Sequence, residues 1–137
     1  EMASLMVGRA VELTVDKAPA QPGDPSLVVT DLVVTDPRGQ VLVDNVSFTL
    51  HRGEILAIAG VQGNGQTELT EAIMGLQSRV HGSISLEGNE LVGDSTREVL
   101  DAGVGFVPED RTEDGLVGTF TIAENLMLDR STGEPFV

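Results

Sequence analysis

The chain has 137 residues, which is enough for one domain with a hydrophobic core and too few for several. Its formal net charge of −14 argues against nucleic acid or an anionic membrane surface as a direct partner, since either would repel it. The chain contains no cysteine, which excludes disulfide bonds and thiolate metal sites, and no apolar run has the length of a membrane span. With 40% hydrophobic residues, most of the chain is expected to fold beneath a solvated acidic surface.

The first 25 residues differ from the rest of the chain in composition. Residues 1–10 are expected to form a short amphipathic helix. Residues 11–25 are expected to be a linker, because their closely spaced prolines cannot propagate a helix or a central strand. Ordered structure is predicted from residue 26 onward. Since the chain begins at Glu1 without an initiator methionine, it is expected to be a piece of a longer protein.

Three segments that follow the linker predict antiparallel strands. Residues 27–35 are rich in valine and threonine, which favour strands. The turn at residues 36–39 has proline at its second position and glycine at its fourth, as type I turns prefer. Residues 41–43 predict a short strand, and residues 46–50 alternate between apolar and polar side chains, which predicts a half-buried strand. Together they predict a small antiparallel sheet.

A buried strand, a glycine-rich loop and a helix are predicted in succession between residues 54 and 76. Residues 55–59 are continuously apolar, which is typical of a strand buried on both faces. Gly60, Gly63 and Gly65 permit backbone conformations and close approaches that a Cβ would block. From Gln66 onward the apolar residues recur at helical spacing, as Leu69, Ala72, Ile73 and Leu76. This order is typical of a phosphate-binding loop, where backbone N–H groups and the helix dipole favour an anion.

Gln66 departs from the phosphate-loop pattern G-x-x-x-x-G-K-[ST], which has lysine at this position. The backbone donors remain, but the charge that would reach the β- and γ-phosphates is lost. At an effective dielectric of about 20, a charge pair about 4 Å apart is worth on the order of 4 kcal/mol gross. Glu68 would repel a nucleotide if it pointed inward. The residues therefore leave ATP binding open and predict impaired hydrolysis at this loop. Glu68 also excludes the dinucleotide pattern G-x-G-x-x-G, since it takes the third glycine's place.

Two strands and two helices are predicted after the loop and its helix. Residues 83–86 and 104–107 predict strands, of which the second is expected to be buried. Capping-box sequences at residues 95–98 and 121–124 predict the starts of two helices. The first of these helices is expected to end at Gly103, a natural C-terminal glycine. The second is expected to turn its apolar residues inward, namely Ile122, Leu126 and Met127.

Three strings, GVQGNGQTELTEAIMGL, VGFVPEDRTEDGLV and TIAENLML, resemble the second nucleotide-binding domain of ABC importers for simple sugars and nucleosides. The GNGQ form of the loop is more similar to the nucleoside-type members. The resemblance implies an α/β fold, with a P-loop NTPase core of the ABC type and an attached antiparallel β-subdomain, truncated at its C-terminal end. It also divides the chain into the tail of a preceding nucleotide-binding domain, a linker and the first half of a second such domain, at residues 1–10, 11–25 and 26–137.

The resemblance implies a site for ATP and Mg²⁺. The residues implied in nucleotide binding are Gly60, Gln62, Gly63, Asn64, Gly65, Gln66, Thr67 and Glu68. The Thr67 hydroxyl would contact Mg²⁺. Glu109 stands where the family has the glutamine of its Q-loop, and its carboxylate is either a Mg²⁺ ligand or an ordinary surface acid. The segment before Val41 lacks the aromatic residue on which adenine would stack. No residue is assigned a catalytic role, because the family's signature motif, Walker B acid and switch histidine are absent from the sequence.

The resemblance further implies part of the ATP-binding subunit of a transport ATPase, cytoplasmic and peripheral on the inner face of the cell membrane. Its partners would be the first nucleotide-binding domain of the same polypeptide and the transmembrane permease subunits. The missing lysine implies the degenerate site of an asymmetric pair, and the chain alone is expected to lack ATPase activity. A non-hydrolytic scaffold that has lost nucleotide and a sensor of ADP or another anion are the alternatives. A strand at residues 55–59 without a neighbour would also predict self-association.

Overall fold

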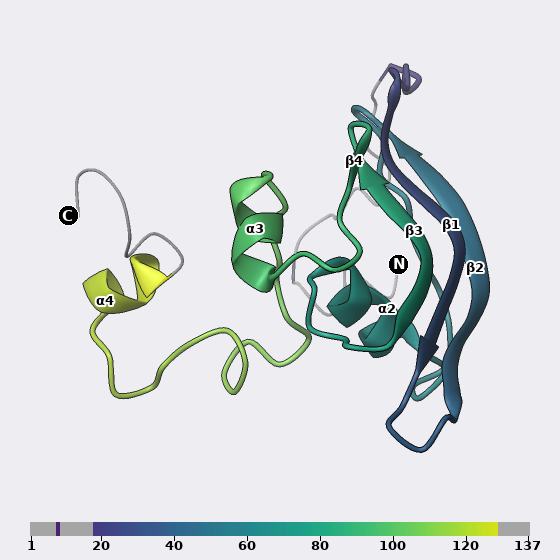
Figure 1. Ribbon diagram of the computed structural model, residues 1–137. Coiled ribbons are helices and arrows are strands. Elements are labelled where there is room, and N and C mark those ends of the chain that lie inside the picture. Colours follow the sequence, from purple (N-terminus) through teal and green to yellow (C-terminus); the bar gives the residue numbers. More distant parts are fainter. Residues whose placement is uncertain (1–7, 9–17, 129–137) are drawn as a thin grey trace.

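The computed structural model describes residue 8 and residues 18–128. Within them lies one antiparallel sheet in the order β2-β1-β3-β4. The strands are β1 (Pro25–Thr35), β2 (Val41–His51), β3 (Val80–Leu86) and β4 (Asn89–Glu90), and the helices are α2 (Gln66–Ile73), α3 (Thr96–Asp101) and α4 (Ile122–Leu126). Figure 1 shows α2 against the inner face of the curved sheet. None of the helices in the described residues is long and apolar enough to cross a membrane.

The N-terminal boundary of the sheet agrees with the prediction to within one residue, since β1 begins at Pro25. The chain just before it is held by two backbone hydrogen bonds. The N–H of Gly23 donates to the carbonyl of Arg52 at 2.9 Å, and the N–H of Arg52 donates to the carbonyl of Asp24 at 3.0 Å. The predicted helix at residues 1–10 lies outside the described residues except for Gly8, and residues 11–17 of the predicted linker lie outside them too.

The strands β1 and β2 form the predicted antiparallel pair. The two short strands predicted after residue 40 are a single strand, because β1 pairs with β2 along its whole length. The pairing shifts register at several points and Asn45 has a φ of 50°. The polar residues that suggested a break therefore lie within the strand. The turn between the strands is closed by Asp36, whose Oδ1 accepts the N–H groups of Arg38 at 2.8 Å and Gln40 at 2.7 Å.

The strand β3 pairs with the other edge of β1 and begins earlier than predicted. It starts at Val80 because β1 offers hydrogen-bonding partners as far as that residue. Glu87 and Gly88 then form a two-residue turn into β4, with φ values of 50° and 88°. Positive φ at both central residues is the requirement of the tight hairpin turn that matches the twist of the strands.

A single hydrophobic core lies between the sheet and the helices α2 and α3. Its buried members are Val29, Leu32, Val34, Val43, Leu69, Ala72, Met74, Ile84, Leu91 and Val99. Leu69 and Ala72 confirm the predicted inner face of α2. The predicted face does not extend to Leu76, whose side chain is 56% exposed. The helix ends at Ile73, and Gly75 turns the chain with a φ of 69°.

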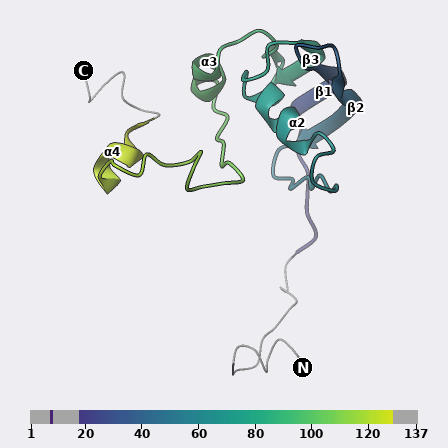
Figure 2. The same ribbon diagram turned by 90° about the horizontal axis from the view of Figure 1, so that it is seen from below.

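The two apolar segments predicted as buried strands, residues 55–59 and 104–107, are not strands in the structure. Ile55 is 92% exposed and Val107 is 79% exposed, so the predicted burial is also wrong. A strand needs neighbours that satisfy its backbone groups, and no strand among the described residues pairs with either segment. Figure 2 shows that the chain after α3 runs away from the sheet.

Both predicted capping boxes are present in the structure. The Ser95 and Thr121 side chains each accept the backbone N–H of the third helical residue, which is a glutamate. The side chain of that glutamate in turn accepts the backbone N–H of the capping residue. The helix α3 is followed by Gly103 with a φ of 103°, as predicted. The inward face predicted for α4 is wrong, because Ile122 is 83% exposed and Leu126 is 74% exposed. Figures 1 and 2 both place α4 apart from the sheet, so the sheet does not cover its apolar residues.

Candidate phosphate-binding site

The first turn of α2 is open toward the glycine-rich loop that precedes it. Its N-cap residue is Gly65, in the left-handed conformation with φ 93° and ψ 4°, and no side chain caps the helix. The first backbone N–H groups of any helix have no acceptor within that helix. Those of Gln66, Thr67 and Glu68 are therefore available to a ligand, and the helix dipole favours an anion there. The local backbone is suited to binding a phosphate group.

The three glycines of the loop meet different structural requirements. Gly63 and Gly65 have positive φ values of 85° and 93°, which confirms the predicted need for glycine. A Cβ on Gly65 would also lie 2.5 Å from the carbonyl oxygen of Leu42 in β2. Gly60 does not have a positive φ, but a Cβ there would overlap the carboxamide of Gln66. The loop thus rests against the sheet at Gly65 and against its own helix at Gly60.

The turn that leads from β2 into the loop is fixed by a carboxylate. Glu54 Oε2 accepts the backbone N–H of His51 at 2.9 Å and lies 3.1 Å from His51 Nδ1. The hydrogen bond from the His51 backbone, followed by that from its ring, lowers the pKa of Glu54 below the ordinary value of 4.5. The carboxylate is therefore charged at neutral pH, and it anchors the end of β2 next to the exposed segment that precedes the loop.

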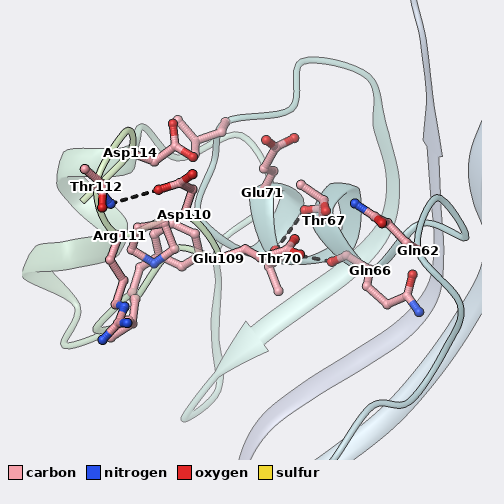
Figure 3. A pocket seen from close by; sticks show the side chains of 14 residues that line it. Gln62, Gln66, Thr67, Thr70, Glu71, Glu109, Asp110, Arg111, Thr112 and Asp114 are labelled. Carbon is pink, nitrogen blue, oxygen red and sulfur yellow. Dashed lines mark hydrogen bonds between the residues drawn. The ribbon is translucent and has the colours of Figure 1, made fainter. Parts of the chain in front are cut away.

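An open cavity of about 1140 Å³ separates the first turns of α2 from the loop after α3. It brings together four of the predicted site residues, namely Gln62, Gln66, Thr67 and Glu109. Figure 3 shows Gln62, Gln66 and Thr67 at the helix start, with Glu109, Asp110 and Arg111 across from them. Residue 109 therefore lines the same cavity as the start of the helix, although the segment before it is not a strand.

A second cavity of about 590 Å³ lies between the loop and β2. Its wall includes the predicted residues Gly60, Asn64, Gly65 and Gln66. Neither cavity is lined by the two remaining predicted residues, Gly63 and Glu68. Gln66 lines both cavities, which places the side chain that departs from the phosphate-loop pattern between them.

Two side chains of the larger cavity, those of Thr67 and Glu109, carry oxygen atoms that suit a hard cation. The Thr67 hydroxyl and the Glu109 carboxylate are exposed and make no hydrogen bond within the described part of the chain. In that part there is no group of three or more histidines or acids placed to hold a metal by themselves. Magnesium commonly takes one or two protein oxygens and completes its shell with water and substrate phosphates. The donor set therefore fits Mg²⁺ bound together with a nucleotide.

Sequence reasoning missed two residues of the cavity wall that belong to α2. Thr70 Oγ1 donates hydrogen bonds to the carbonyls of Thr67 at 2.8 Å and Gln66 at 3.2 Å, which secures the first turn. Glu71 faces the cavity and accepts a hydrogen bond from Gln77 Nε2 at 2.7 Å. The signal was present, because residues three and four positions after Thr67 share its face of the helix.

The wall of the larger cavity is mainly negative. Its carboxylates come from Glu71, Glu109, Asp110 and Asp114, and Arg111 supplies one guanidinium. Asp110 is occupied locally, since its Oδ1 accepts the backbone N–H groups of Thr112 at 2.9 Å and Glu113 at 3.1 Å. A free nucleotide polyanion would be repelled by this wall, whereas its Mg²⁺ complex carries less negative charge.

Comparison with known proteins finds one family model, similar sequences and a similar structure. The ABC transporter family model matches residues 43–134. The nucleoside import ATP-binding protein NupA of Lactococcus lactis is 45% identical over 128 residues, which cover 93% of this chain and 25% of that protein. The guanosine import ATP-binding protein NupO of Bacillus subtilis is 42% identical over 136 residues, which cover 99% of this chain and 27% of that protein. The glucose import ATP-binding protein TsgD13 of Haloferax volcanii is 43% identical over 125 residues, which cover 91% of this chain and 23% of that protein.

The chain therefore spans about a quarter of the length of these relatives. Among solved structures, a bacterial Atm1-family ABC exporter with ATP bound matches with a TM-score of 0.55 and 23% identity. That match covers 80% of this chain and 20% of the exporter chain. The family match and the structural match confirm the predicted fold, an α/β P-loop NTPase core of the ABC type that carries an antiparallel sheet.

Proposed function

This chain belongs to the ABC transporter family, and from that membership we propose that it is part of the ATP-binding subunit of an importer for simple sugars or nucleosides. The observation that carries the proposal is the uncapped N-terminus of α2 behind a loop with two left-handed glycines. Relatives named for import of a nucleoside and of guanosine favour a nucleoside-type importer.

We propose that residues 60–68 bind the phosphates of ATP mainly through backbone N–H groups. The Thr67 hydroxyl and the Glu109 carboxylate would hold Mg²⁺, which neutralises phosphate charge when it is bound. Gln66 supplies no charge to the γ-phosphate, where negative charge accumulates during phosphoryl transfer. The loop is therefore a degenerate half-site that binds nucleotide weakly and hydrolyses it poorly.

The partners that this role requires are those of a tandem ATPase. The loop would face the signature motif of the first nucleotide-binding domain of the same polypeptide, with ATP between them, and the subunit would be peripheral on the cytoplasmic face of the membrane, bound to permease subunits. Measurable ATP turnover by the purified 137-residue chain would contradict the assignment of a half-site. Self-association of the chain by itself stays a prediction, now motivated by exposed apolar side chains such as Ile55 and Val61.

Calorimetric titration of the two-domain subunit, with the lysine of the first domain's loop substituted, tests the binding role. We expect saturable binding of MgATP at the remaining loop. We also expect at least a tenfold loss of affinity when EDTA removes Mg²⁺, because the free nucleotide meets the carboxylates of the cavity wall unneutralised. Equal binding with and without Mg²⁺ would remove Thr67 and Glu109 from the proposed site.

The negative cavity wall also favours a second candidate function, a scaffold that couples to the membrane subunits without nucleotide. Glu71, Glu109, Asp110 and Asp114 outnumber the one guanidinium of the wall, which opposes any anion. The same titration separates the two functions. Saturable MgATP binding excludes the pure scaffold, and its absence excludes the nucleotide half-site. Competition between ATP, ADP and inorganic phosphate in that titration would reveal a sensor of other anions.

A further inference from the structure

Asn64 is the asparagine of the glycine-rich loop, and it is exposed just before the chain enters α2. Its carboxamide makes no hydrogen bond within the described residues. Gly63 and Gly65 flank it, both with positive φ, so no adjoining side chain hinders its rotation. Asn64 also borders the cavity between the loop and β2, where water can reach it. The side chain is therefore free to approach the backbone and open to solvent.

The backbone nitrogen of Gly65 is the group that this side chain can reach. Asparagine side chains are short enough to interact with the backbone of the residues next to them. The N–H of Gly65 donates to no acceptor in the described part of the chain. Because glycine has no Cβ, nothing on Gly65 shields its nitrogen from the carboxamide carbon of Asn64. A bond between these two atoms would close a five-membered ring.

The other three asparagines of the chain lack this combination, since none of them precedes a glycine. Asn45 and Asn89 lie within the strands β2 and β4, and each is followed by a residue that carries a side chain. The carboxamide of Asn125 is held in place, because its Oδ1 accepts the backbone N–H of Val117 at 2.8 Å and its Nδ2 donates to backbone carbonyls. These three residues are internal references for the reactivity of Asn64.

We infer that Asn64 is a modification site, at which the chain deamidates spontaneously with water as the sole co-reactant. The Gly65 nitrogen forms a bond to Cγ of Asn64, the Cγ–Nδ2 bond breaks, and the proton of the Gly65 N–H leaves with the amide nitrogen as ammonia. Water then opens the cyclic imide at one of its two carbonyls. Opening at the main-chain carbonyl gives isoaspartate, and opening at the side-chain carbonyl gives aspartate.

Either product places a negative charge in the loop, because a carboxylate of this kind is ionised at neutral pH. The charge stands next to the open first turn of α2, where it opposes the binding of an anion. The isoaspartate product also lengthens the main chain between Gly63 and Gly65, whose left-handed conformations shape the loop. Deamidation therefore lowers the affinity of the loop for a phosphate group as the protein ages. This consequence, unlike the modification itself, rests on the proposed nucleotide-binding function.

The modification is tested by peptide mapping of the folded 137-residue chain, incubated at mildly alkaline pH and followed by mass spectrometry. The mass gain that replaces NH₂ by OH should accumulate at Asn64 at least about tenfold faster than at Asn45, Asn89 or Asn125, because the neighbouring glycine leaves the reacting nitrogen unshielded. Asn64→Gln is the matched variant. It keeps the amide but requires a larger ring, so position 64 should stay unmodified while circular dichroism shows the chain folded. Equal rates at all four asparagines, or an unmodified Asn64, would overturn the inference.

The consequence for binding is tested with Asn64→Asp in the two-domain subunit whose first loop is disabled. Calorimetric titration with MgATP should show about tenfold weaker binding, because a carboxylate has been added beside the phosphates. Gly118→Asp is the control. It adds the same charge where a Cβ meets nothing within 4 Å, and its Kd should be unchanged. An Asn64→Asp variant that binds like the unsubstituted protein would overturn the loss of affinity. If the unsubstituted subunit does not bind MgATP, the proposed function fails, and the peptide map by itself decides the modification.

Discussion

The antiparallel sheet and the segment that precedes the loop are both rich in β-branched and aliphatic residues, yet their environments differ. In β1, Val29 is 2% exposed and Leu32 is fully buried, whereas Ile55 is 92% exposed and Ile58 is 52% exposed. The difference lies in partners, because β1 pairs with β2 on one edge and β3 on the other. Residues 55–59 pair with no strand in the described part of the chain. Composition alone therefore did not determine burial.

This comparison divides the molecule into two parts with different roles. The sheet with α2 and α3 carries the core and should determine the stability of the chain. The loop and the segments at residues 55–59 and 106–114 also line the two cavities, and they contribute no residue to the buried core. Substitutions in the first part should change the free energy of unfolding, and those in the second should change ligand binding. Four stability experiments and one binding experiment test this division.

The largest effect is expected from the core. Leu32→Ala removes a fully buried side chain and should lower the free energy of unfolding by about 2–5 kcal/mol. Ile55→Ala, its counterpart on the exposed segment, should change that free energy by no more than about 0.5 kcal/mol. Urea denaturation followed by circular dichroism measures both. A loss above about 2 kcal/mol for Ile55→Ala would show that the segment is buried in solution.

The next effect concerns the contact between the loop and the sheet. Gly65→Ala forces a left-handed alanine and places its Cβ 2.5 Å from the Leu42 carbonyl oxygen, so it should cost about 2–3 kcal/mol. Gly63→Ala adds a Cβ into open space at a similar φ and should cost about 1 kcal/mol. Thermal unfolding of both variants gives the ranking. Equal losses would mean that the loop does not rest on β2.

The two capping boxes provide a smaller and closely matched comparison. Ser95→Ala should lower the free energy of unfolding by about 1 kcal/mol, because α3 contributes the fully buried Val99 to the core. Thr121→Ala removes an equivalent cap from α4, which has no buried residue, and should leave global unfolding unchanged while reducing helix content. Denaturation midpoints together with far-ultraviolet circular dichroism make the test. If Thr121→Ala lowered the free energy of global unfolding, α4 would have to unfold together with the sheet, which contradicts the expectation.

The smallest effect is a pH dependence that arises in the first capping box. The hydrogen bonds from the Ser95 side chain and backbone lower the pKa of Glu98 below its ordinary value of 4.5. A lowered pKa in the folded state gives stability that is complete above pH 4.5 and is lost as pH falls through the folded-state pKa. Glu98→Gln should flatten the decline of unfolding free energy in that acid range, measured by urea titrations at stepped pH.

The matched control is Glu124, whose pKa is lowered by the equivalent hydrogen bonds from Thr121 in α4. Because α4 buries no residue, Glu124→Gln should leave the pH dependence of global unfolding unchanged. If the unfolding free energy of the Glu98→Gln variant fell with decreasing pH as steeply as that of the unsubstituted protein, Glu98 would not be the source of the effect.

The features that the sequence predicted correctly are those set by neighbours in the chain. The left-handed glycines at 63 and 65, the two capping boxes and the β1–β2 pair all depend on contacts or conformations readable from residue order. The incorrect predictions concern residues 55–59, residues 104–107 and the face of α4. Each of these needed a partner element to cover it, and sequence periodicity does not state whether that partner is adjacent.

The candidate site shows the same division between local and distant information. The open helix start and the place of Thr67 follow from the motif, and both are present in the structure. The contact of Gln66 with Gly60 depends on the direction of the Gln66 side chain. The sequence shows that lysine is replaced by Gln66, but only the structure shows that the Gln66 carboxamide lies against Gly60.

The most direct test of the central claim is the affinity of the loop for MgATP when a charge is restored at position 66. The claim is that backbone donors without a charged side chain form a weak phosphate site. In the two-domain subunit with the first domain's loop disabled, Gln66→Lys should bind MgATP at least tenfold more tightly than the unsubstituted protein, because an ammonium near a phosphate adds more than about 1.4 kcal/mol. An affinity equal to or below that of the unsubstituted protein would contradict the account.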